Sequence, residues 1–525
     1  MGLSRVAMLA AVLGVLVAPV VTVGGQYYVS PQGDDSNPGT SADKAFKSIG
    51  KAASVAGPGD VVGIAPGKYV ETVSVANSGT VEAPITFRRE GEGEVVLTNP
   101  RPDPEAWAEK YVFRIDGKSH VVIEGLTFRD CAAWILIRDG HHCTVRKCIF
   151  DGVHIYNAMR INSGSFNRIE DCDFKRAVER TGFREKEPWI PVPGADYIEI
   201  FRDSNNNLVQ GCRFGAITHT AVSVSAVEPK QFKPSRNIVR GNTFRDPYWK
   251  CLWFHAGEHN VFEDNVCSGP SAAFVQLEAP TSIIRRNVFK AYHDSTDGNP
   301  HIDLRGVMRF QYEGTCGNRI YNNLFVGNER TITNNSWSGT VTDNLFKNNI
   351  FFDNGQTIFL GWPEYESKNR NCFLNNLIRG TTAGQKVVQI QRDKSYTLAE
   401  AQEALPALFK GNFEAVPLFV NVDKGDFRPQ EKSPTIDAGA ALTFAIGAGK
   451  GTDVVVDDAL YFCDGFGQIE GDLVVVGSNE PVRVVKVDYD KKTLTLEHPV
   501  TWQANDPVNL AYKGKGPDVG PFEGQ

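Results

Sequence analysis

The chain repeats one short pattern of apolar and polar positions along most of its length. An apolar residue is followed three positions later by Asn, Cys or Leu, and two positions after that by Phe, as in Val145-Arg-Lys-Cys148-Ile-Phe150 and Ile284-Arg-Arg-Asn287-Val-Phe289. The pattern returns about ten times, at a spacing of ~22 residues or at that spacing plus an insertion. Such a unit is too short for a helix pair, and its alternation is typical of strands. The repeat therefore predicts an all-β protein, a right-handed parallel β-helix.

Stacked coils place equivalent residues in ladders at the ~4.8 Å spacing of paired strands. A buried Asn at a turn bonds the backbone of its own coil and the amide of the next, so the Asn run predicts a structural role. The three cysteines of the same ladder are expected to be buried thiols, and their spacing lacks a zinc signature. The ladder consists of Leu126, Cys148, Cys172, Cys212, Asn242, Asn265, Asn287 and Asn323.

Both ends of the predicted solenoid carry extra elements. Residues 46–56 have helical apolar spacing and should cap the first coil, because an exposed coil end is an unpaired sheet edge. A second short helix is expected within 392–412. Short alternating runs near the carboxyl terminus predict a small β-barrel or sandwich, which either shields the solenoid end, the role we favour, or binds carbohydrate. The predicted organisation is a signal peptide, the β-helix, the β insertion and a closing strand, over residues 1–25, 26–440, 441–516 and 517–525.

The amino terminus has the features of an export signal. Arg5 precedes an apolar run from Val6 to Val23, and the small residues Gly24 and Gly25 follow, which predicts cleavage after Gly25. The alternative is an uncleaved membrane anchor. After cleavage the chain is expected to be secreted, extracellular or periplasmic, monomeric and free of the membrane. The net charge of −7 and the pI near 5.9 argue against nucleic acid as a partner.

Three segments resemble a known group of proteins: Tyr27-Tyr-Val-Ser-Pro-Gln-Gly-Asp-Asp-Ser-Asn-Pro-Gly-Thr40, Ser433-Pro-Thr-Ile-Asp-Ala-Gly439 and Asp518-Val-Gly-Pro-Phe-Glu523. They are similar to the opening and closing signatures of secreted right-handed β-helix carbohydrate-active enzymes. That group includes chondroitinase B and alginate lyase-like polysaccharide lyases, and β-helix glycoside hydrolases such as β-xylosidases. The resemblance implies a pectate-lyase-like solenoid and a polysaccharide substrate. Its motifs indicate the fold and leave the reaction open.

The candidate catalytic and binding residues lie on the strand that follows each repeat. In a triplet such as Trp253-Phe-His255 the middle residue faces the core, so its neighbours face outward. Stacking these positions predicts a polar strip, with Tyr197 and Trp253 beside it as rings for sugar binding. The charged and amide members of this strip are Arg160, Asn162, Glu199, His255, Glu278, Asp303 and Arg305.

Three insertions follow Phe174, Phe214 and Phe289, on the coils that carry the strip. Loops that rise beside a flat strand face form cleft walls in a solenoid. The third insertion, residues 290–302, is the richest in titratable groups and contains His293.

Hydrolysis of a glycosidic bond is the first reaction that the strip predicts. It needs one protonated and one ionised carboxyl group, ~5 Å apart for retention or ~6.5–9.5 Å apart for inversion. Glu278 and Asp303 are expected on neighbouring coils as this pair, with His255 and Arg305 tuning their pKa values. Such a hydrolase requires no cofactor. The residues expected to bind substrate are Arg160, Asn162, Glu199, Trp253, Lys250 and His293.

β-Elimination from a uronic acid polymer, or C5 epimerisation with the same first step, is the alternative. It needs Ca²⁺ or Arg to neutralise the uronate, and a base such as Lys or His to remove the C5 proton. The cations and bases available are Arg160, Arg305, His255, Lys250 and His293; Ca²⁺ would bind through Glu199, Glu278 and Asp303. No metal site is assigned. A non-catalytic carbohydrate-binding or surface solenoid is the third alternative, against which the acid pair argues.

Overall fold

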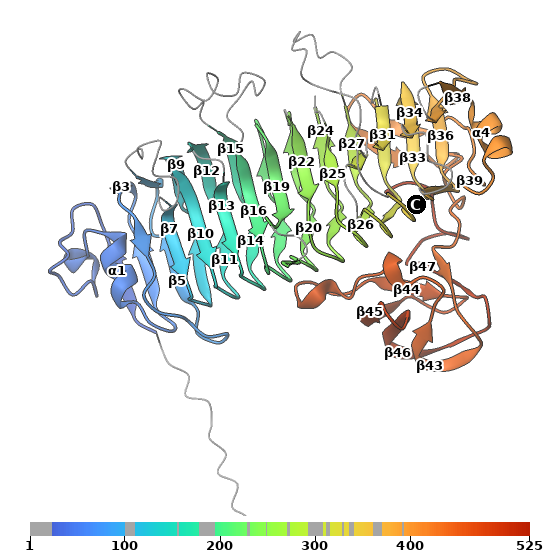
Figure 1. Cartoon of the computed structure of the whole chain (residues 1–525). Helices are drawn as coiled ribbons and strands as arrows, with labels where there is room; N and C mark the ends of the chain where they lie inside the picture. The colour runs from blue at the N-terminus through green and yellow to red at the C-terminus, as the bar shows by residue number, and fades with distance from the viewer. Residues whose placement is uncertain are drawn as a thin grey trace, which may run out of the picture.

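The computed structural model describes residues 24–99, 111–154, 157–177, 195–227, 231–247, 249–269, 273–291, 308–310, 315–327, 330–334, 341–360, 370–390 and 393–524. In these residues the chain forms a right-handed parallel β-helix, which confirms the predicted fold class. Three long sheets run along it, here called A, B and C (Figure 1). Each full coil gives one strand to each sheet in turn, so every strand pairs with the strand one coil away.

The strands of sheet A are β1 (Gln26–Val29), β2 (Val61–Ile64), β5 (Ile85–Arg89), β8 (Val121–Glu124), β11 (Thr144–Arg146), β14 (Arg168–Glu170), β17 (Leu208–Gln210), β20 (Ile238–Arg240), β23 (Val261–Glu263), β26 (Ile283–Arg285), β29 (Arg319–Tyr321), β32 (Leu345–Lys347), β35 (Cys372–Leu374) and β39 (Phe409–Lys410). Those of sheet B are β3 (Gly67–Val70), β6 (Val95–Thr98), β9 (Thr127–Cys131), β12 (Ile149–Val153), β15 (Asp173–Arg176), β18 (Arg213–Phe214), β21 (Thr243–Arg245), β24 (Val266–Ser268), β27 (Val288–Lys290), β30 (Leu324–Val326), β33 (Ile350–Asn354) and β36 (Leu377–Gly380).

The strands of sheet C are β4 (Val73–Ser74), β7 (Tyr111–Asp116), β10 (Ala133–Arg138), β13 (Asn157–Asn162), β16 (Asp196–Phe201), β19 (Thr220–Ser225), β22 (Lys250–Phe254), β25 (Val275–Leu277), β28 (Met308–Phe310), β31 (Arg330–Asn334), β34 (Gln356–Leu360), β37 (Val388–Ile390) and β38 (Lys394–Tyr396). All pairs in it are parallel except β37 with β38, which closes the sheet as an antiparallel hairpin.

The Phe of the repeat pattern forms a stack in the core. Rings on successive coils lie nearly parallel, with centroids 4.7 Å apart for Phe150 and Phe174 and again for Phe174 and Phe214. Each of these side chains is almost completely buried. Because the repeat places one ring above the next, each additional coil buries further apolar surface.

The Asn ladder bonds neighbouring coils as predicted. The side-chain oxygen of Asn265 accepts from the backbone N–H of Asn242 at 2.9 Å, and its amide nitrogen donates to the carbonyl oxygen of Val239 at 3.0 Å. The same nitrogen donates to the side-chain oxygen of Asn287 at 3.0 Å. Cys148, Cys172 and Cys212 are buried at earlier positions of this ladder, and all ten cysteines are unpaired.

Replacing Asn265 with Leu should lower the free energy of unfolding by ~2–5 kcal/mol, because the buried groups of Asn242 and Val239 lose their partners. Cys, which the same ladder carries at position 212, should cost less at position 265, since a thiol still donates weakly to a carbonyl group. Urea unfolding measures both variants. Equal stability of Asn265→Leu and the unmodified chain would contradict a structural role for the ladder.

Both predicted helices are present at the solenoid ends. Helix α1 (Ile49–Val55) lies at the amino-terminal end (Figure 1) and buries Ile49, Ala52 and Ala53. It begins where the Ser48 hydroxyl accepts from the N–H of Lys51, an N-cap. Helix α4 (Leu398–Ala404) lies between β38 and β39 and starts with a capping box formed by Thr397 and Glu400. Short 3₁₀ turns span Ala42–Lys44, Ala459–Tyr461 and Gly465–Gly467.

A small β domain follows the solenoid. Its antiparallel sheet consists of β42 (Thr443–Phe444), β43 (Gly449–Val455), β44 (Leu473–Val476), β45 (Val482–Asp488), β46 (Thr493–Trp502) and β47 (Pro507–Leu510), after the hairpin β40 (Phe419–Asn421) and β41 (Asp426–Pro429). It lies beside the carboxyl-terminal half of the solenoid (Figure 1). Its core is joined to sheet A, because Leu208, Ile238, Val261 and Ile283 belong to the same apolar cluster.

Two predictions at the chain ends need comment. The closing strand expected at 517–525 is wrong for residues 517–524, which form no strand. Its backbone bonds to the preceding chain are scattered and do not form a strand register: the N–H of Gly439 donates to Pro517, that of Val519 to Thr435 and that of Gly520 to Asn348. Most of the predicted signal peptide lies outside the described residues. Among those described, no helix is long and apolar enough to cross a membrane.

Candidate functional site

The outward positions of sheet C form a strip of polar side chains across five consecutive coils. The strand register aligns Arg160, Glu199, Ser223, Trp253 and Gln276 in one row. We define the sheet C strip as Arg160, Asn162, Asp196, Glu199, His219, Ser223, Ser225, Lys250, Trp253, His255, Gln276 and Glu278. Parallel pairing fixes their order along the solenoid, because a one-residue slip would turn every side chain into the core.

The prediction that Tyr197 faces outward is wrong. Its side chain is fully buried, its ring centroid lies 5.7 Å from that of Trp134, and its hydroxyl donates to the carbonyl of Ala216 at 2.8 Å. The chain turns from sheet B into sheet C just before this point, and at that corner two consecutive residues face the core, here Tyr197 and Ile198. Strict alternation resumes at Glu199, so the outward triplet begins two residues later than expected.

Arg160 and Glu199 lie together at one end of the strip. The Nε of Arg160 is 2.6 Å from a carboxylate oxygen of Glu199, whose other oxygen accepts from the Ser225 hydroxyl at 2.9 Å. The Asn157 amide also donates to this carboxylate, and the Arg160 guanidinium lies 4.0 Å from the Phe201 ring centroid. Burial raises the pKa of Glu199 although Arg160 opposes the shift. The two predicted substrate-binding residues are therefore adjacent. Asn162 lies two residues beyond Arg160 on β13 and is partly exposed.

A histidine and a carboxylate that the sequence analysis missed lie in the middle of the strip. The Nδ1 of His219 is 2.6 Å from one oxygen of Asp196, and the Ser223 hydroxyl donates to the other at 3.0 Å. Asp196 is 2 % exposed, and the His219 ring meets the Trp253 ring edge-on with centroids 6.1 Å apart. A carboxylate against one ring nitrogen fixes the orientation of an imidazole. The only sequence signal was an Asp placed directly before a corner.

Lys250, Trp253 and His255 lie on or directly after β22. The Lys250 ammonium is 4.2 Å from the Trp253 ring centroid, and the rings of Trp253 and His255 meet edge-on at 5.0 Å. Lys250 is 3 % exposed, whereas the His255 side chain is 28 % exposed. Of these two titratable groups, His255 is therefore the one that a substrate on this face reaches.

The next coil adds Glu278 directly after β25. One of its carboxylate oxygens lies 3.7 Å from the Nε2 of His255, and the Gln276 amide donates to the other oxygen. Burial lowers the pKa of His255, and the neighbouring Lys250 lowers it further. The imidazole is thus held neutral near pH 7, in contact range of a buried carboxylate.

The structure places Glu278 but not Asp303, the other member of the predicted acid pair. Asp303, Arg305 and His293 lie outside the described residues. Within the described part of the chain, no three His, Cys, Asp or Glu side chains are grouped so that they could hold a metal ion. The strip does bring together a neutral imidazole, two cations and three carboxylates on one face. This set of groups permits proton transfer and the binding of a polar or anionic chain.

Comparison with protein families supports the solenoid. A family described as "Right handed beta helix region" matches residues 111–289, and one described as "Protein of unknown function (DUF1565)" matches residues 31–75. A protein of Bacillus subtilis (strain 168), described as "Uncharacterized protein YwoF", is 40% identical over 107 residues. That alignment covers 20% of this chain and 22% of the relative, so the chain matches about a fifth of the relative's length.

Solved structures to which this chain is similar include a pectate lyase and a polysaccharide lyase. Pectate lyase Pel9A is 16% identical with a TM-score of 0.46, covering 96% of this chain and 98% of that one. The PL6 family polysaccharide lyase Pedsa3628 from Pseudopedobacter saltans is 14% identical with a TM-score of 0.48, covering 73% and 94%. XylC in complex with xylose is 12% identical with a TM-score of 0.42, covering 92% and 99%. The right-handed β-helix itself is shown by the strand topology and by the family match over residues 111–289.

Proposed function

We propose that the chain is an exported carbohydrate-active enzyme that cleaves a uronate-containing polysaccharide by β-elimination on the sheet C strip. The observation that supports this most is His255. Its imidazole is partly exposed, its pKa is lowered by partial burial and by Lys250, and it lies on the face where the polar side chains gather. A neutral base beside a cation is the arrangement that removal of a proton next to a carboxylate requires.

In the proposed reaction His255 takes the C5 proton of the uronate. The electron pair of that bond forms the C4–C5 double bond, and the C4–O bond breaks with its electrons leaving on the oxygen. The positive charges of Arg160 and Lys250 stabilise the charge that develops on the uronate. His219, which Asp196 orients, is positioned to return a proton to the leaving oxygen.

Calcium has no assigned step in this proposal. The described carboxylates of the strip are spread along it: Asp196 contacts His219, Glu199 contacts Arg160 and Glu278 contacts Gln276. They do not converge on one point as the oxygen ligands of Ca²⁺ do. The rate with and without EDTA tests whether Ca²⁺ takes part.

Hydrolysis is the second candidate, and one observation favours it. The Glu278 side chain is only 2 % exposed and lies 3.7 Å from His255, and a carboxyl group is the acid that glycoside hydrolysis uses. Its expected partner Asp303 lies outside the described residues. In this case Glu278 would protonate the glycosidic oxygen.

An assay on a panel of neutral and uronate-containing polysaccharides tests the proposal. Reducing ends and the ultraviolet absorbance of unsaturated uronate are followed together, with and without EDTA. Elimination predicts that both signals rise on a polyuronate. Reducing ends without absorbance would replace elimination by hydrolysis at Glu278, and no signal on any polymer would favour the carbohydrate-binding solenoid.

The pH profile gives a second test. Because the pKa of His255 lies below its usual value of 6.5, the base stays deprotonated at pH 6.5, and kcat/KM should fall only at lower pH. The charged groups that face it are Lys250 from its own strand and Glu278 from the next coil. His259 also has a pKa lowered by burial but stacks on Tyr489 in the β domain, so His259→Gln should leave the profile unchanged. An acid limb above pH 6.5 would exclude His255 as the base.

A further inference from the structure

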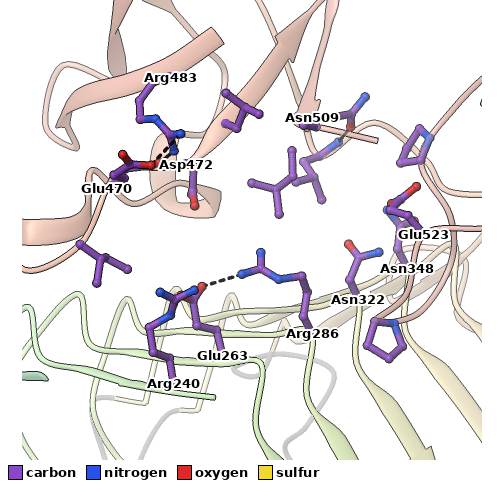
Figure 2. Close-up of a pocket in the computed structure, with 18 of the residues that line it drawn as sticks. Arg240, Glu263, Arg286, Asn322, Asn348, Glu470, Asp472, Arg483, Asn509 and Glu523 are labelled. Atoms are coloured by element: carbon purple, nitrogen blue, oxygen red, sulfur yellow. Dashed lines mark hydrogen bonds and ion pairs between the residues drawn. The ribbon is translucent and has the colours of Figure 1, made fainter. Parts of the chain in front are cut away.

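A cavity with a volume of about 450 Å³ lies where the β domain meets the solenoid. Arg240, Glu263 and Arg286 line it from the solenoid side, and Glu470 and Arg483 line it from the β domain (Figure 2). Its solenoid wall belongs to the sheet A side, so it is separate from the sheet C strip. The proposed reaction makes no use of it.

The charges around the cavity are balanced. Arg240 and Arg286 contact Glu263 at 3.0 and 2.9 Å, and Arg483 contacts Glu470 at 2.8 Å. Asp472 is held by Arg285. Each arginine of the described lining therefore already faces a carboxylate. An acidic ligand would have to displace one of these partners, whereas a neutral ligand would not.

The wall also offers hydrogen-bonding groups that point inward. Arg286 donates to Asp264 and Glu263 through Nε and Nη2, and Figure 2 shows its remaining nitrogen directed into the cavity. The Glu523 carboxyl also lines the cavity, beside Asn348 in Figure 2, and burial and the nearby Asp518 raise its pKa to about 7. At neutral pH this group both donates and accepts.

Apolar residues also line the cavity: Leu442, Ile469, Leu473, Leu510, Pro517 and Pro521. A lining that combines planar polar groups with apolar side chains suits a sugar ring, which has hydroxyl groups at its rim and C–H groups on its faces. A volume of this size accommodates a single sugar residue.

We infer that this cavity binds a neutral sugar residue, so that the β domain anchors the polysaccharide in addition to covering the solenoid. The choice of a sugar over other neutral polyols rests on the proposed function. The cavity between the β domain and the solenoid is observed independently of that function.

Calorimetry on the full chain with xylose, glucose, galactose and glucuronate tests the inference. At least one neutral sugar should bind saturably. Glucuronate should bind at least ~10-fold more weakly, because its carboxylate needs a cationic partner and each arginine that lines the cavity is already paired with a carboxylate. Ala511 lines the cavity, and Ala511→Phe should abolish binding by filling it. Ala504→Phe places the same ring at an exposed turn and should leave binding unchanged.

Glu523→Gln is a variant that keeps the shape of the cavity and carries a separate readout. Asp518 and Asp437 are the charged groups that face Glu523, and the N–H groups of Asp518 and Lys513 donate to it. In the unmodified chain glucuronate should bind still more weakly as the pH rises through about 7, because Glu523 becomes charged. That dependence should vanish in Glu523→Gln.

Three outcomes would overturn the inference: no saturable binding of any neutral sugar, binding that survives in a folded Ala511→Phe variant, or glucuronate as the tightest ligand. His255→Gln separates this inference from the proposed function. That variant should lose activity on the polysaccharide and keep binding in the cavity, whereas Ala511→Phe should keep activity on a short oligosaccharide that the strip alone can hold.

Discussion

Replacing His255 with Gln should lower kcat/KM on a polyuronate by ~10²–10⁴, the usual contribution of a general base. Gln is of similar size and cannot take up a proton at neutral pH. The fold should be unaffected, because the backbone N–H of His255 still donates to Val224 and the side chain is partly exposed. Steady-state kinetics and the thermal transition of the same preparation measure both effects.

Lys250→Met distinguishes an electrostatic role from a packing role. Its ammonium lowers the pKa of His255, so the variant should move the acid limb of the pH profile upward as well as lower kcat. Met is of similar length and removes only the charge that lies 4.2 Å from the Trp253 ring centroid. Full activity in His255→Gln, or an unmoved acid limb in Lys250→Met, would remove β22 from the catalytic site.

Arg285→Met should lower the free energy of unfolding by ~3–5 kcal/mol, because it removes the cation that pairs with Asp472 and one of the three arginines that pair with the buried Glu263. The Arg285 side chain is 2 % exposed and contacts Asp472 at 2.6 Å and Glu263 at 2.7 Å. It also donates to the Tyr321 hydroxyl at 2.9 Å. Since Asp472 belongs to the β domain, the variant should also release that domain to proteolysis before the solenoid unfolds. Urea unfolding and limited proteolysis measure the two effects.

Arg428→Met is the matched control. Arg428 pairs with Asp426 two residues away and its side chain is 61 % exposed, so the loss should be within ~1 kcal/mol. The buried network also predicts an acid effect. Burial opposes the ionisation of Glu263, but Arg285, Arg286 and Arg240 lower its pKa to about 2. The stability it contributes is present above pH 4.5 and lost as the pH falls toward 2. Equal loss in Arg285→Met and Arg428→Met would contradict this account of the domain junction.

The repeat pattern predicted the solenoid because its signal is local and recurs. Phe150 and Asn265 each have an equivalent one coil away, so the stacks in the core follow from spacing alone. The corners between sheets are different. Tyr197 and Ile198 both face the core, and a strict period of two assigns one of them to the wrong side.

The candidate site was predictable only in part for the same reason. Arg160, Glu199, His255 and Glu278 follow the corner, where alternation resumes, and they lie on one face as expected. Asp196 precedes the corner and His219 precedes its strand, so neither fell in a triplet. The contact of Arg285 with Asp472 spans 187 residues and leaves no local pattern in the sequence.

The most direct test of the central claim is a crystal structure of His255→Gln with a short oligouronate. The account predicts the sugar chain along sheet C, with one uronate beside residue 255 and its carboxylate toward Arg160 or Lys250. An oligouronate bound elsewhere on the solenoid, with the sheet C strip empty, would contradict the assignment of the active site.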